Sequence, residues 1–346
     1  MKIRIFLLLL LFVVAGLHSS TFSSPDDTLC VAFYNLENLY DNFDDTLKED
    51  SEWNPGGKKE WSEERLSKKM LNLWKAVSSI NSDSGPDILG FCESENEAVA
   101  QRLVDEYFGK DKYRLAYKES PDGRGIDVGL IYKPEFLQLI SVTGDTVQPV
   151  GDSYPTRLVL HVTFIQYSTS ETLHVFVNHW PSRRGSNDIT EIYRCKAAKV
   201  LKNRVNELYA EDKNANIIIF GDFNDEPTNI SIKDTLGTLP FYGEEEELDI
   251  YDDPQLFNLA FEKKEKGEGS YKYQEFWNML DQIIVSSNLI TGKLKYLQDS
   301  FEIYKPDWLQ TPSGKYKGTP FPTYGGSNYL GGYSDHFPVL AKFIVR

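Results

Sequence analysis

Cysteine is scarce in this sequence of 346 residues, and the three that occur form no recognisable framework. Cys30, Cys92 and Cys195 are an odd number and show none of the short spacings that zinc sites use. Cys30 and Cys92 each lie inside an apolar run that is typical of a buried strand. The pattern favours buried free thiols over a disulfide scaffold, so stability must come from a hydrophobic core.

Positive charge is also in short supply. The chain has 37 Lys and Arg against 52 Asp and Glu, which gives a formal net charge of −15. This field repels polyanions and argues against tight, nonspecific binding of duplex DNA without a metal. Any polyanionic partner must therefore be held by local features. Hydrophobic residues make up 40% of the chain, which is ample for the core of one large or two ordinary domains.

The sequence has only one hydrophobic run near its start and no later run long enough to span a membrane. Lys2 and Arg4 precede an apolar stretch at 6–16, and small polar residues follow at 19–24. This order predicts a secretory signal peptide over residues 1–22, with a retained anchor as the alternative. We expect an exported protein, periplasmic or extracellular, without a stable membrane anchor.

No internal repeat of a solenoid period is present, and strand and helix signals alternate along the chain. Ser62 is positioned to cap a helix whose apolar residues recur at helical spacing. The other helices are expected at about 96–108 and 188–209. Short apolar runs predict strands at 29–36, 87–92, 113–117, 125–132, 136–142, 157–164, 172–178, 216–220, 278–285 and 337–345. The stretch 229–269 is loop-rich and acidic, which is typical of solvated surface.

The strand at 216–220 organises the chain. Its consecutive apolar residues suit a strand that is covered on both faces. Asp222 and Asn224 follow at once, two positions apart and therefore on the same side of an extended backbone. A carboxylate and an amide placed together can hold water beside a metal or a phosphate. The alternative is an ordinary polar turn, since Gly, Asp and Asn are common turn residues.

Other polar groups also stand at strand ends, although they are scattered over three hundred residues. Each of them alone is more often a simple turn former. A sheet gathers the ends of its strands along one rim, so these side chains can converge there. They are Asn35, Glu37, Glu93, His179, Asp222, Asn224, Asp281, Asp335 and His336.

Six segments, in order, resemble the signatures of the endonuclease/exonuclease/phosphatase superfamily. They are Asn35-Leu36-Glu37-Asn38, 86–93 ending in Glu93, Asn178-His179-Trp180-Pro181-Ser182, Gly221-Asp222-Phe223-Asn224-Asp225, Leu280-Asp281 and Ser334-Asp335-His336. The resemblance covers essentially the whole mature chain. It implies an α/β, four-layer sandwich of two packed, mostly antiparallel β-sheets flanked by helices. It also implies a single catalytic domain over 26–346, with one metal-dependent phosphoesterase site at a rim.

The residue types suit that chemistry, because phosphoester hydrolysis needs charge neutralisation, an activated water and help for the leaving oxygen. Carboxylates and an amide favour Mg²⁺, with Mn²⁺ or Ca²⁺ as alternatives, whereas no Cys and His cluster suggests zinc. We assign the metal to Asn35, Glu93 and Asp335, with Glu37 as a secondary candidate. Asp222 and Asn224 are expected to orient water, His179 to stabilise the oxyanion or leaving group, and His336 to pair with Asp281.

Asp335 and His336 are adjacent, so on a straight strand their side chains would face opposite ways. Both reach one site only if the backbone turns there, and Gly331-Gly332 just upstream makes such a turn plausible.

The substrate is less defined than the chemistry. Arg124 and Arg183 are candidates for phosphate binding, and the aromatic loop with Trp308, Tyr316, Phe321, Tyr324 and Tyr329 could stack on bases, cover a lipid or sugar, or simply pack. We expect a nuclease or phosphodiesterase, acting as a monomer on DNA or RNA. The alternatives are a phosphatase or phospholipase C-like enzyme on inositol phosphates or phospholipids, and a catalytically silent binding protein. The chain lacks the Trp-Cys-Asp-Arg stretch of inositol 5-phosphatases and the membrane-inserting hairpin of secreted sphingomyelinases.

Overall fold

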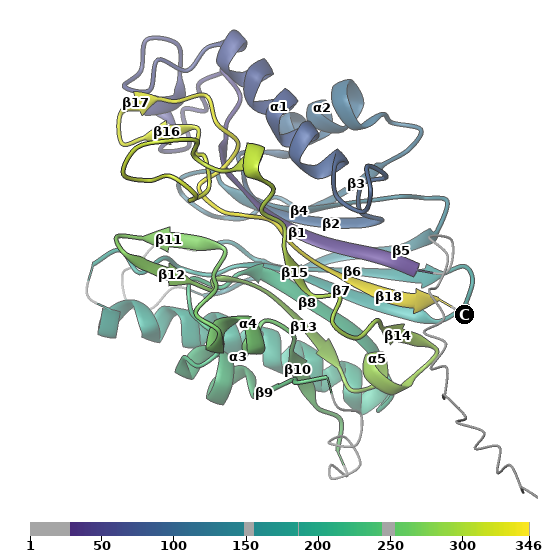
Figure 1. The fold of residues 1–346 in the computed structure, drawn as a ribbon. Helices are drawn as coiled ribbons and strands as arrows, with labels where there is room; N and C mark the ends of the chain where they lie inside the picture. Colours follow the sequence, from purple (N-terminus) through teal and green to yellow (C-terminus); the bar gives the residue numbers. More distant parts are fainter. Residues whose placement is uncertain (1–27, 149–155, 186, 244–252, 346) are drawn as a thin grey trace, which may run out of the picture.

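The computed structural model describes residues 28–148, 156–185, 187–243 and 253–345. The expected signal peptide and the acidic run at 244–247 lie outside these ranges. Two seven-stranded sheets pack face to face, and helices cover their outer faces (Figure 1). This arrangement confirms the expected four-layer α/β sandwich. Among the described residues, no helix combines the length and the apolar character needed to cross a bilayer.

The first sheet has the strand order β14-β18-β1-β2-β4-β3, and β15 pairs with β18. Every pair of neighbours is antiparallel except β1 and β2, which are parallel. The strands are β1 (Thr28–Leu39), β2 (Ile88–Ser94), β3 (Arg114–Tyr117), β4 (Asp127–Tyr132), β14 (Leu294–Tyr296), β15 (Glu302–Ile303) and β18 (Val339–Val345).

The second sheet has the order β5-β6-β7-β8-β13-β10-β9. Here β7 and β8 are parallel, as are β9 and β10, and the other pairs are antiparallel. The strands are β5 (Leu137–Asp145), β6 (Val159–Gln166), β7 (Thr172–His179), β8 (Asn216–Asp222), β9 (Thr238–Pro240), β10 (Leu256–Asn258) and β13 (Asp281–Ser286).

Helices α1 (Glu63–Ser78) and α2 (Glu97–Leu103) cover the first sheet, and α3 (Asn187–Glu211) covers the second (Figure 1). Ser62 caps α1 as predicted, because its side chain accepts the backbone N–H of Arg65. The helix expected at 96–108 continues beyond α2 as a π-helical turn. Two short helices are α4 (Phe261–Glu265) and α5 (Asn288–Thr291), and two hairpins are β11 (Tyr271–Tyr273) with β12 (Phe276–Asn278) and β16 (Tyr324–Gly325) with β17 (Asn328–Tyr329). Short 3-10 helices at Ser51–Trp53 and Asp307–Leu309 and a π-helical turn at Ser231–Leu236 complete the list of described elements.

The core lies between the two sheets. Every residue of β8 is buried, which confirms that this strand is covered on both faces. Phe220 of β8 packs against Phe33 of β1, with ring centroids 5.9 Å apart. Gly90 of β2 makes this approach feasible, since a Cβ there would lie 1.8 Å from the Phe220 ring. The sandwich therefore closes tightly beneath the strand ends that carry the candidate site.

Two apolar helix positions differ from the sequence prediction. Trp74 of α1 is 37% exposed and Ile192 of α3 is 59% exposed, although both belong to the helically spaced apolar residues of their segments. The buried row of α3 instead runs through Leu208, Val205, Leu201 and Ala198 and continues at Arg194, which forms an ion pair with Asp225. Charge hides this position from a pattern that counts only apolar residues.

Candidate active site

Strand register places the candidate side chains in one row across the second sheet. His179 of β7 pairs in register with Asp222 of β8, and Asp222 pairs with Asp281 of β13. In the first sheet, Asn35 of β1 lies opposite Cys92 of β2, just before Glu93. The carboxyl ends of the parallel pairs β1-β2 and β7-β8 thus open at the same place, as expected from the sequence.

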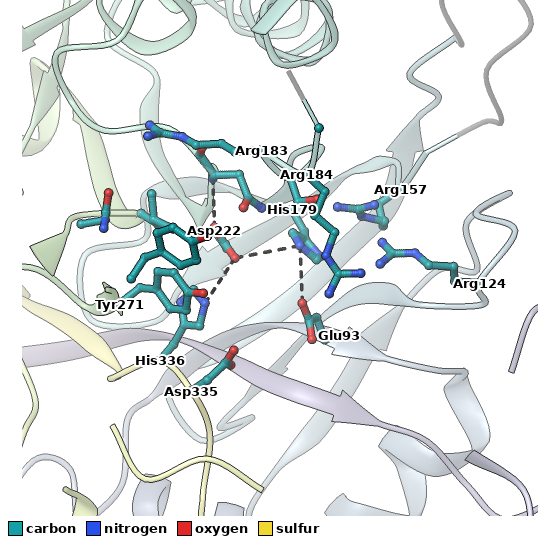
Figure 2. A pocket seen from close by; sticks show the side chains of 16 residues that line it. Glu93, Arg124, Arg157, His179, Arg183, Arg184, Asp222, Tyr271, Asp335 and His336 are labelled. Atoms are coloured by element: carbon teal, nitrogen blue, oxygen red, sulfur yellow. Dashed lines mark hydrogen bonds and ion pairs between the residues drawn. The ribbon is translucent and has the colours of Figure 1, made fainter. Parts of the chain in front are cut away.

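These strand ends line a cavity of about 660 Å³. Figure 2 shows Asp222 between the two imidazoles, with Tyr271 and Asp335 on the side of His336. The predicted site residues that line the cavity are Glu93, Arg124, His179, Arg183, Asp222, Asn224, Asp335 and His336. Asn35 and Asp281 lie directly behind this lining, where each hydrogen-bonds a lining residue.

His336 pairs with Asp281 as predicted. Its Nδ1 lies 2.6 Å from Asp281 Oδ2, which also accepts the Ser270 hydroxyl. Its Nε2 lies 3.8 Å from Asp222 Oδ2, and its ring stacks on Tyr271 with centroids 4.6 Å apart. Burial works against the charged ring, but Asp281 and Asp222 hold the pKa of His336 well above its usual range. This imidazole is therefore held as a cation.

The pKa of His179 is shifted in the opposite direction from that of His336. Its Nε2 lies 3.7 Å from Glu93 Oε1 and 3.9 Å from Asp222 Oδ2, while its buried Nδ1 has no hydrogen-bond partner among the described residues. Burial, reinforced by Arg157 and Arg124, holds the pKa of His179 well below its usual range. A neutral ring with its proton on Nε2 is the form that suits two facing carboxylates.

Asp222 lies between the two imidazoles. Its Oδ2 accepts the side-chain amide of Asn35 at 3.0 Å, and its Oδ1 accepts the backbone N–H of Asn224 at 2.9 Å. Burial raises the pKa of Asp222 to about 6; His336 offsets part of this rise, and Asp281 adds to it. A carboxylate with a pKa near neutrality can accept and release a proton during turnover.

Asn224 has a left-handed backbone with φ of 50°. Its side-chain amide donates to the Trp180 carbonyl at 3.0 Å, which ties the loop after β8 to the residue that follows His179. A non-glycine residue at positive φ is uncommon and is kept only where the surroundings enforce it. Asn224 therefore fixes the two strand ends relative to each other.

Glu93 also has a left-handed backbone, with φ of 64°, at the point where the β2 register shifts. Its Oε2 accepts the backbone N–H of Asn38 at 3.0 Å, and its Oε1 lies 3.4 Å from the Asn35 amide nitrogen. The Asn35 amide oxygen accepts the backbone N–H of Glu37. Asn35 thus donates to both Glu93 and Asp222 and orients the two carboxylates.

Glu37 does not line the cavity. Its carboxylate accepts the backbone N–H groups of Thr323 and Tyr324, and Lys69 Nζ lies 3.7 Å away. These contacts do not support the secondary assignment of Glu37 to the metal, which stays a prediction. The partners that occupy this carboxylate lie nearly three hundred residues further along the chain, and the sequence could not reveal them.

Asp335 and His336 both line the cavity because the chain bends at Asp335. Ser334 stabilises the bend, since its hydroxyl donates to the Asn35 carbonyl at 2.7 Å and accepts the His336 backbone N–H at 3.1 Å. Burial raises the pKa of Asp335 to about 7; His336 lowers it, while Glu37 and Glu93 raise it. The expected turn is present, although it falls four residues after Gly331.

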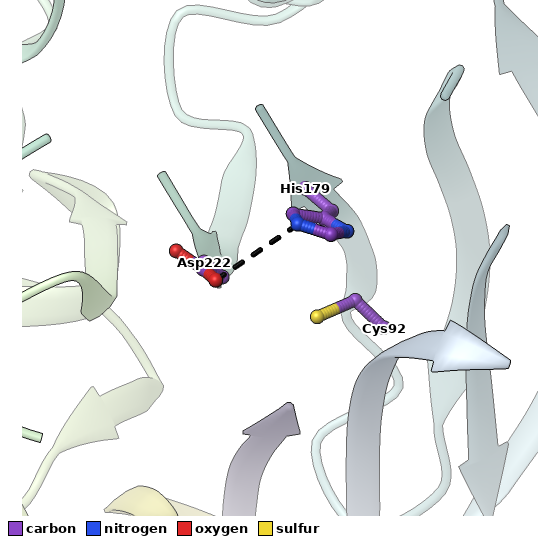
Figure 3. Close-up of side chains that lie close together, drawn as sticks. All are labelled: Cys92, His179 and Asp222. Atoms are coloured by element: carbon purple, nitrogen blue, oxygen red, sulfur yellow. Dashed lines mark ion pairs between the residues drawn. The ribbon is translucent and has the colours of Figure 1, made fainter. Parts of the chain in front are cut away.

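Two groups of side chains in the described residues are close enough to share a metal ion: Cys92 with His179 and Asp222, and Asp222 with Asp281 and His336. Figure 3 shows the first group. Burial, reinforced by Asp222, raises the pKa of the Cys92 thiol well above its usual value, which keeps it protonated and a poor ligand. In the second group, Asp281 already pairs with a cationic His336. Neither group includes Glu93 or Asp335.

Arg183 lines the cavity, but its guanidinium is already engaged. It donates to the Asn224 carbonyl at 2.7 Å, to Asp225 at 3.1 Å and to Asn229 at 2.8 Å. Arg124 lies 3.6 Å from Asp122, and its side chain is 42% exposed. Of these two candidates for substrate binding, Arg124 is the one that remains accessible.

Among the lining residues to which the sequence assigned no role are Arg157, Arg184, Tyr271 and Tyr273. Arg184 follows Arg183 directly, and that proximity was the available signal. The tyrosines belong to the β11-β12 hairpin, whose short strands the sequence did not indicate. None of the five residues of the aromatic loop, from Trp308 to Tyr329, lines the cavity. Tyr324, for example, packs edge-on against Trp53, so the packing alternative holds for it.

The fold and the site together define a phosphoric ester hydrolase of the α/β sandwich type. A model of the endonuclease/exonuclease/phosphatase family matches residues 30–344, and the chain belongs to that family. No curated protein matches the sequence.

Several solved structures share the fold at low sequence identity. An endonuclease/exonuclease/phosphatase family protein from Bacteroides thetaiotaomicron is 16% identical, with a TM-score of 0.56, covering 92% of this chain and 98% of its own. A mannosyl-6-phosphatase of the same organism is also 16% identical, with a TM-score of 0.56, and the match covers 91% of this chain and 99% of its own. TDP2 of D. rerio, complexed with a single-strand DNA product, is 15% identical, with a TM-score of 0.56, and the match covers 92% of this chain and 99% of its own. At these identities the likeness carries the fold alone.

Proposed function

We propose that the protein is an exported, divalent-metal-dependent phosphoesterase that cleaves P–O bonds by in-line attack of water. One observation carries the proposal: a single cavity brings Asp222 within 3.9 Å of two imidazoles with opposite charge tendencies. Groups with pKa values pushed apart by their surroundings are the usual mark of acid–base chemistry.

The roles follow from the contacts. Asp222 accepts the proton of the attacking water, since its carboxyl has a pKa of about 6 and is held by Asn35 and Asn224. His336, cationic on its Asp281 partner, stabilises negative charge on the phosphoryl oxygens. His179, neutral and protonated on Nε2, donates a hydrogen bond to a phosphoryl or leaving oxygen.

The carboxylates suit a divalent cation. Glu93 and Asp335 line the cavity. Burial raises the pKa of Asp335 to about 7, and Glu37 and Glu93 add to this rise through a repulsion that bound positive charge would relieve. Oxygen donors of this kind favour Mg²⁺, with Mn²⁺ or Ca²⁺ as alternatives. We assign the ion to Glu93 and Asp335, with Asn35 orienting Glu93. When bound, it would neutralise phosphoryl charge and polarise the ester.

Two classes of substrate have support, and for both of them we propose that the protein acts as a monomer. For a nuclease or phosphodiesterase, the β11-β12 hairpin carries the exposed rings of Tyr273 and Phe276, which could stack on bases, and Tyr273 also lines the cavity. For a phosphatase on a compact substrate, four arginines line the same cavity. Among the structural neighbours, TDP2 with its single-strand DNA product fits the first class, and the mannosyl-6-phosphatase fits the second. A silent binding protein is the third alternative, and the complete set of catalytic residue types argues against it.

The experiment is a substrate panel: duplex and single-stranded DNA, RNA, sugar phosphates, inositol phosphates and sphingomyelin, each with Mg²⁺, Mn²⁺, Ca²⁺ or EDTA. We expect turnover that requires a divalent ion and stops in EDTA. Hydrolysis undiminished by EDTA would contradict the metal assignment, and binding of a phosphoester without any turnover would favour the silent alternative.

Export is supported by the amino-terminal pattern over residues 1–22. Sequencing the amino terminus of the protein recovered from a periplasmic or medium fraction tests it. We expect a mature chain that begins close to residue 23. Recovery of the intact chain in the membrane fraction would instead indicate a retained anchor.

A further inference from the structure

The cavity has an uneven distribution of charge. Figure 2 shows the side chains of Arg124, Arg157 and Arg184 converging on the side of His179, away from His336 and Asp335. We call these three residues the arginine cluster. The chain as a whole has a net charge of −15, so this grouping of cations is a local feature. It lies beside the groups that handle the scissile phosphoryl rather than among them.

Arg157 is the buried member of the arginine cluster, with a side chain only 5% exposed. It lies 3.2 Å from Asp122 and donates to the Trp180 carbonyl at 2.9 Å, next to His179. Its Nε is also buried and has no hydrogen-bond partner among the described residues. Arg157 therefore lines the cavity as a fixed positive charge, held in place by Asp122 and the Trp180 carbonyl.

The arginine cluster also has too few acids to balance it. Arg124 and Arg157 share the single carboxylate of Asp122, at 3.6 Å and 3.2 Å. Arg184 is exposed, and within the described ranges it forms no ion pair. Arg183 does not belong to the cluster, because Asp225 and Asn229 hold it. Asp122 and, at longer range, Glu93 act on the three guanidinium groups, so the cluster keeps an excess of positive charge at the cavity.

We propose that the arginine cluster is a second anion subsite, which binds a phosphate next to the one that is hydrolysed. The fork of guanidinium donors matches the several acceptor oxygens of a phosphate. Preferred substrates therefore carry two neighbouring phosphates, as in a sugar bisphosphate or a 5′-phosphorylated dinucleotide. This inference rests on the proposed function, since it assigns the substrate class of the same cavity.

The test measures kcat/KM for matched pairs that differ by one neighbouring phosphate: inositol 4,5-bisphosphate against inositol 5-phosphate, and 5′-phosphorylated against unphosphorylated thymidine dinucleotide. Whichever pair is turned over identifies the source of the second phosphate. The wild-type protein is compared with Arg124→Gln, Arg184→Gln and the control Lys213→Gln. Lys213 is an exposed residue that precedes the start of β8, at the end opposite the cavity. Among the described residues it forms a solvent-exposed ion pair with Asp253.

We expect the wild-type protein to prefer the substrate with two phosphates by at least about 10-fold, the usual size of a charge-assisted contact. Arg124→Gln and Arg184→Gln should remove this preference through a higher KM, with smaller effects on the partner substrate. Lys213→Gln should retain it. Equal losses on both substrates of a pair, or no preference in the wild-type protein, would overturn the subsite while leaving the proposed hydrolysis intact.

A second measurement is independent of turnover. Calorimetric titration of the metal-free protein with inorganic phosphate should show binding that weakens at least about 10-fold in Arg124→Gln and Arg184→Gln and is unchanged in Lys213→Gln. Absence of hydrolysis on every substrate together with this binding pattern would remove the proposed function but keep the subsite. Absence of a difference between the variants and the wild-type protein would refute the subsite.

Discussion

At the scale of single residues, the site works because neighbouring groups with similar chemistry have different surroundings. His179 and His336 lie within 3.9 Å of the same carboxylate, yet Arg157 and Arg124 act on one ring and Asp281 on the other. One imidazole is thereby a neutral donor and the other a cation. Sequence spacing could not assign these states, because they depend on residues from several distant strands.

Asp222→Asn tests the residue on which both imidazoles converge. The amide keeps the shape but cannot accept a proton, so we expect kcat to fall by about 10² to 10⁴-fold. The fold should remain intact, because the wild-type carboxyl is buried and its pKa of about 6 already reflects a cost of ionisation. Activity assays and circular dichroism check both parts. Asp307→Asn, an exposed acid outside the cavity, serves as control. Activity within a few-fold of wild type would remove Asp222 from the mechanism.

At the scale of elements, helix α1 does more than cover a sheet. One of its faces packs on the core, and a second face carries Lys69 and Asn72 to the loop that precedes Asp335. Lys69 Nζ donates to the Thr323 hydroxyl at 2.6 Å and to the Tyr333 carbonyl at 2.7 Å. The Asn72 amide donates to the carbonyls of Gly331 and Gly332. The helix therefore positions the bend that brings Asp335 into the cavity.

Lys69→Met should loosen this attachment. The loss of a support behind a metal ligand typically weakens metal affinity by about 10 to 100-fold, and we expect a loss of that size for Mn²⁺, measured by calorimetry. Lys68→Met is a matched control, since Lys68 is exposed on the same turn of α1. Thermal unfolding of the metal-free variants reports the stability effect separately. Unchanged Mn²⁺ affinity in folded Lys69→Met would show that the contact is structural only.

Strands β6 and β7 carry a second element-scale feature, a pair of histidines remote from the cavity. His161 Nε2 lies 3.1 Å from His174 Nδ1, and the His161 ring stacks on Phe176. Burial lowers the pKa of His161 to about 4, and it lowers the pKa of His174 as well. Only one proton fits between the two facing nitrogens, so protonation of both rings is disfavoured.

This pair makes stability depend on pH. The unfolded chain protonates His161 below about pH 6.5 while the folded protein does not until about pH 4. The contribution of His161 to the free energy of unfolding should therefore be fully present above pH 6.5. It should fall by about 1.4 kcal/mol per pH unit as the pH drops toward 4. Urea unfolding at pH 7.5, 6 and 5 measures the slope. His161→Phe keeps the stacking and should reduce the slope by about one proton, and an unchanged slope would contradict the assignment.

At the scale of the whole molecule, the sequence was enough to predict the α/β sandwich and most of the site residues that gather at the strand ends. The residues it identified stand at strand ends, and a sheet brings strand ends together whatever the intervening loops do. It failed for Arg157 and Lys69, because a cation in a sequence reads as surface charge. Their partners lie 35 residues away in Asp122 and 254 residues away in Thr323. The Glu37 partners Thr323 and Tyr324 were also hidden from the sequence, because they lie nearly three hundred residues further along the chain.

The site also joins the two sheets, because Glu93 comes from the first and Asp222 from the second. Asn35 bridges them, with its amide nitrogen 3.4 Å from Glu93 and 3.0 Å from Asp222. Of our proposed metal ligands, Glu93 lies in β2 of the first sheet and Asp335 in the loop that precedes β18 of the same sheet. A cation held there would bind only the folded molecule, because the unfolded chain separates these acids by 242 residues, from 93 to 335. Metal binding should therefore stabilise the protein as a whole.

Saturating Mn²⁺ should raise the Tm of the wild-type protein by several degrees. A ligand at 100 times its Kd contributes about 2.7 kcal/mol, and each kcal/mol shifts the Tm of a domain this large by about 2 °C or slightly less. EDTA should reverse the shift, and Glu93→Gln should abolish most of it. Glu95→Gln is the matched control, because Glu95 lies two residues from Glu93 and does not line the cavity. Burial raises the pKa of Glu95 to about 8, so the amide replaces a carboxyl group that is largely neutral at pH 7. Differential scanning calorimetry with and without Mn²⁺ measures the shift. A shift that survives Glu93→Gln but disappears in Glu95→Gln would place the ion elsewhere in the molecule.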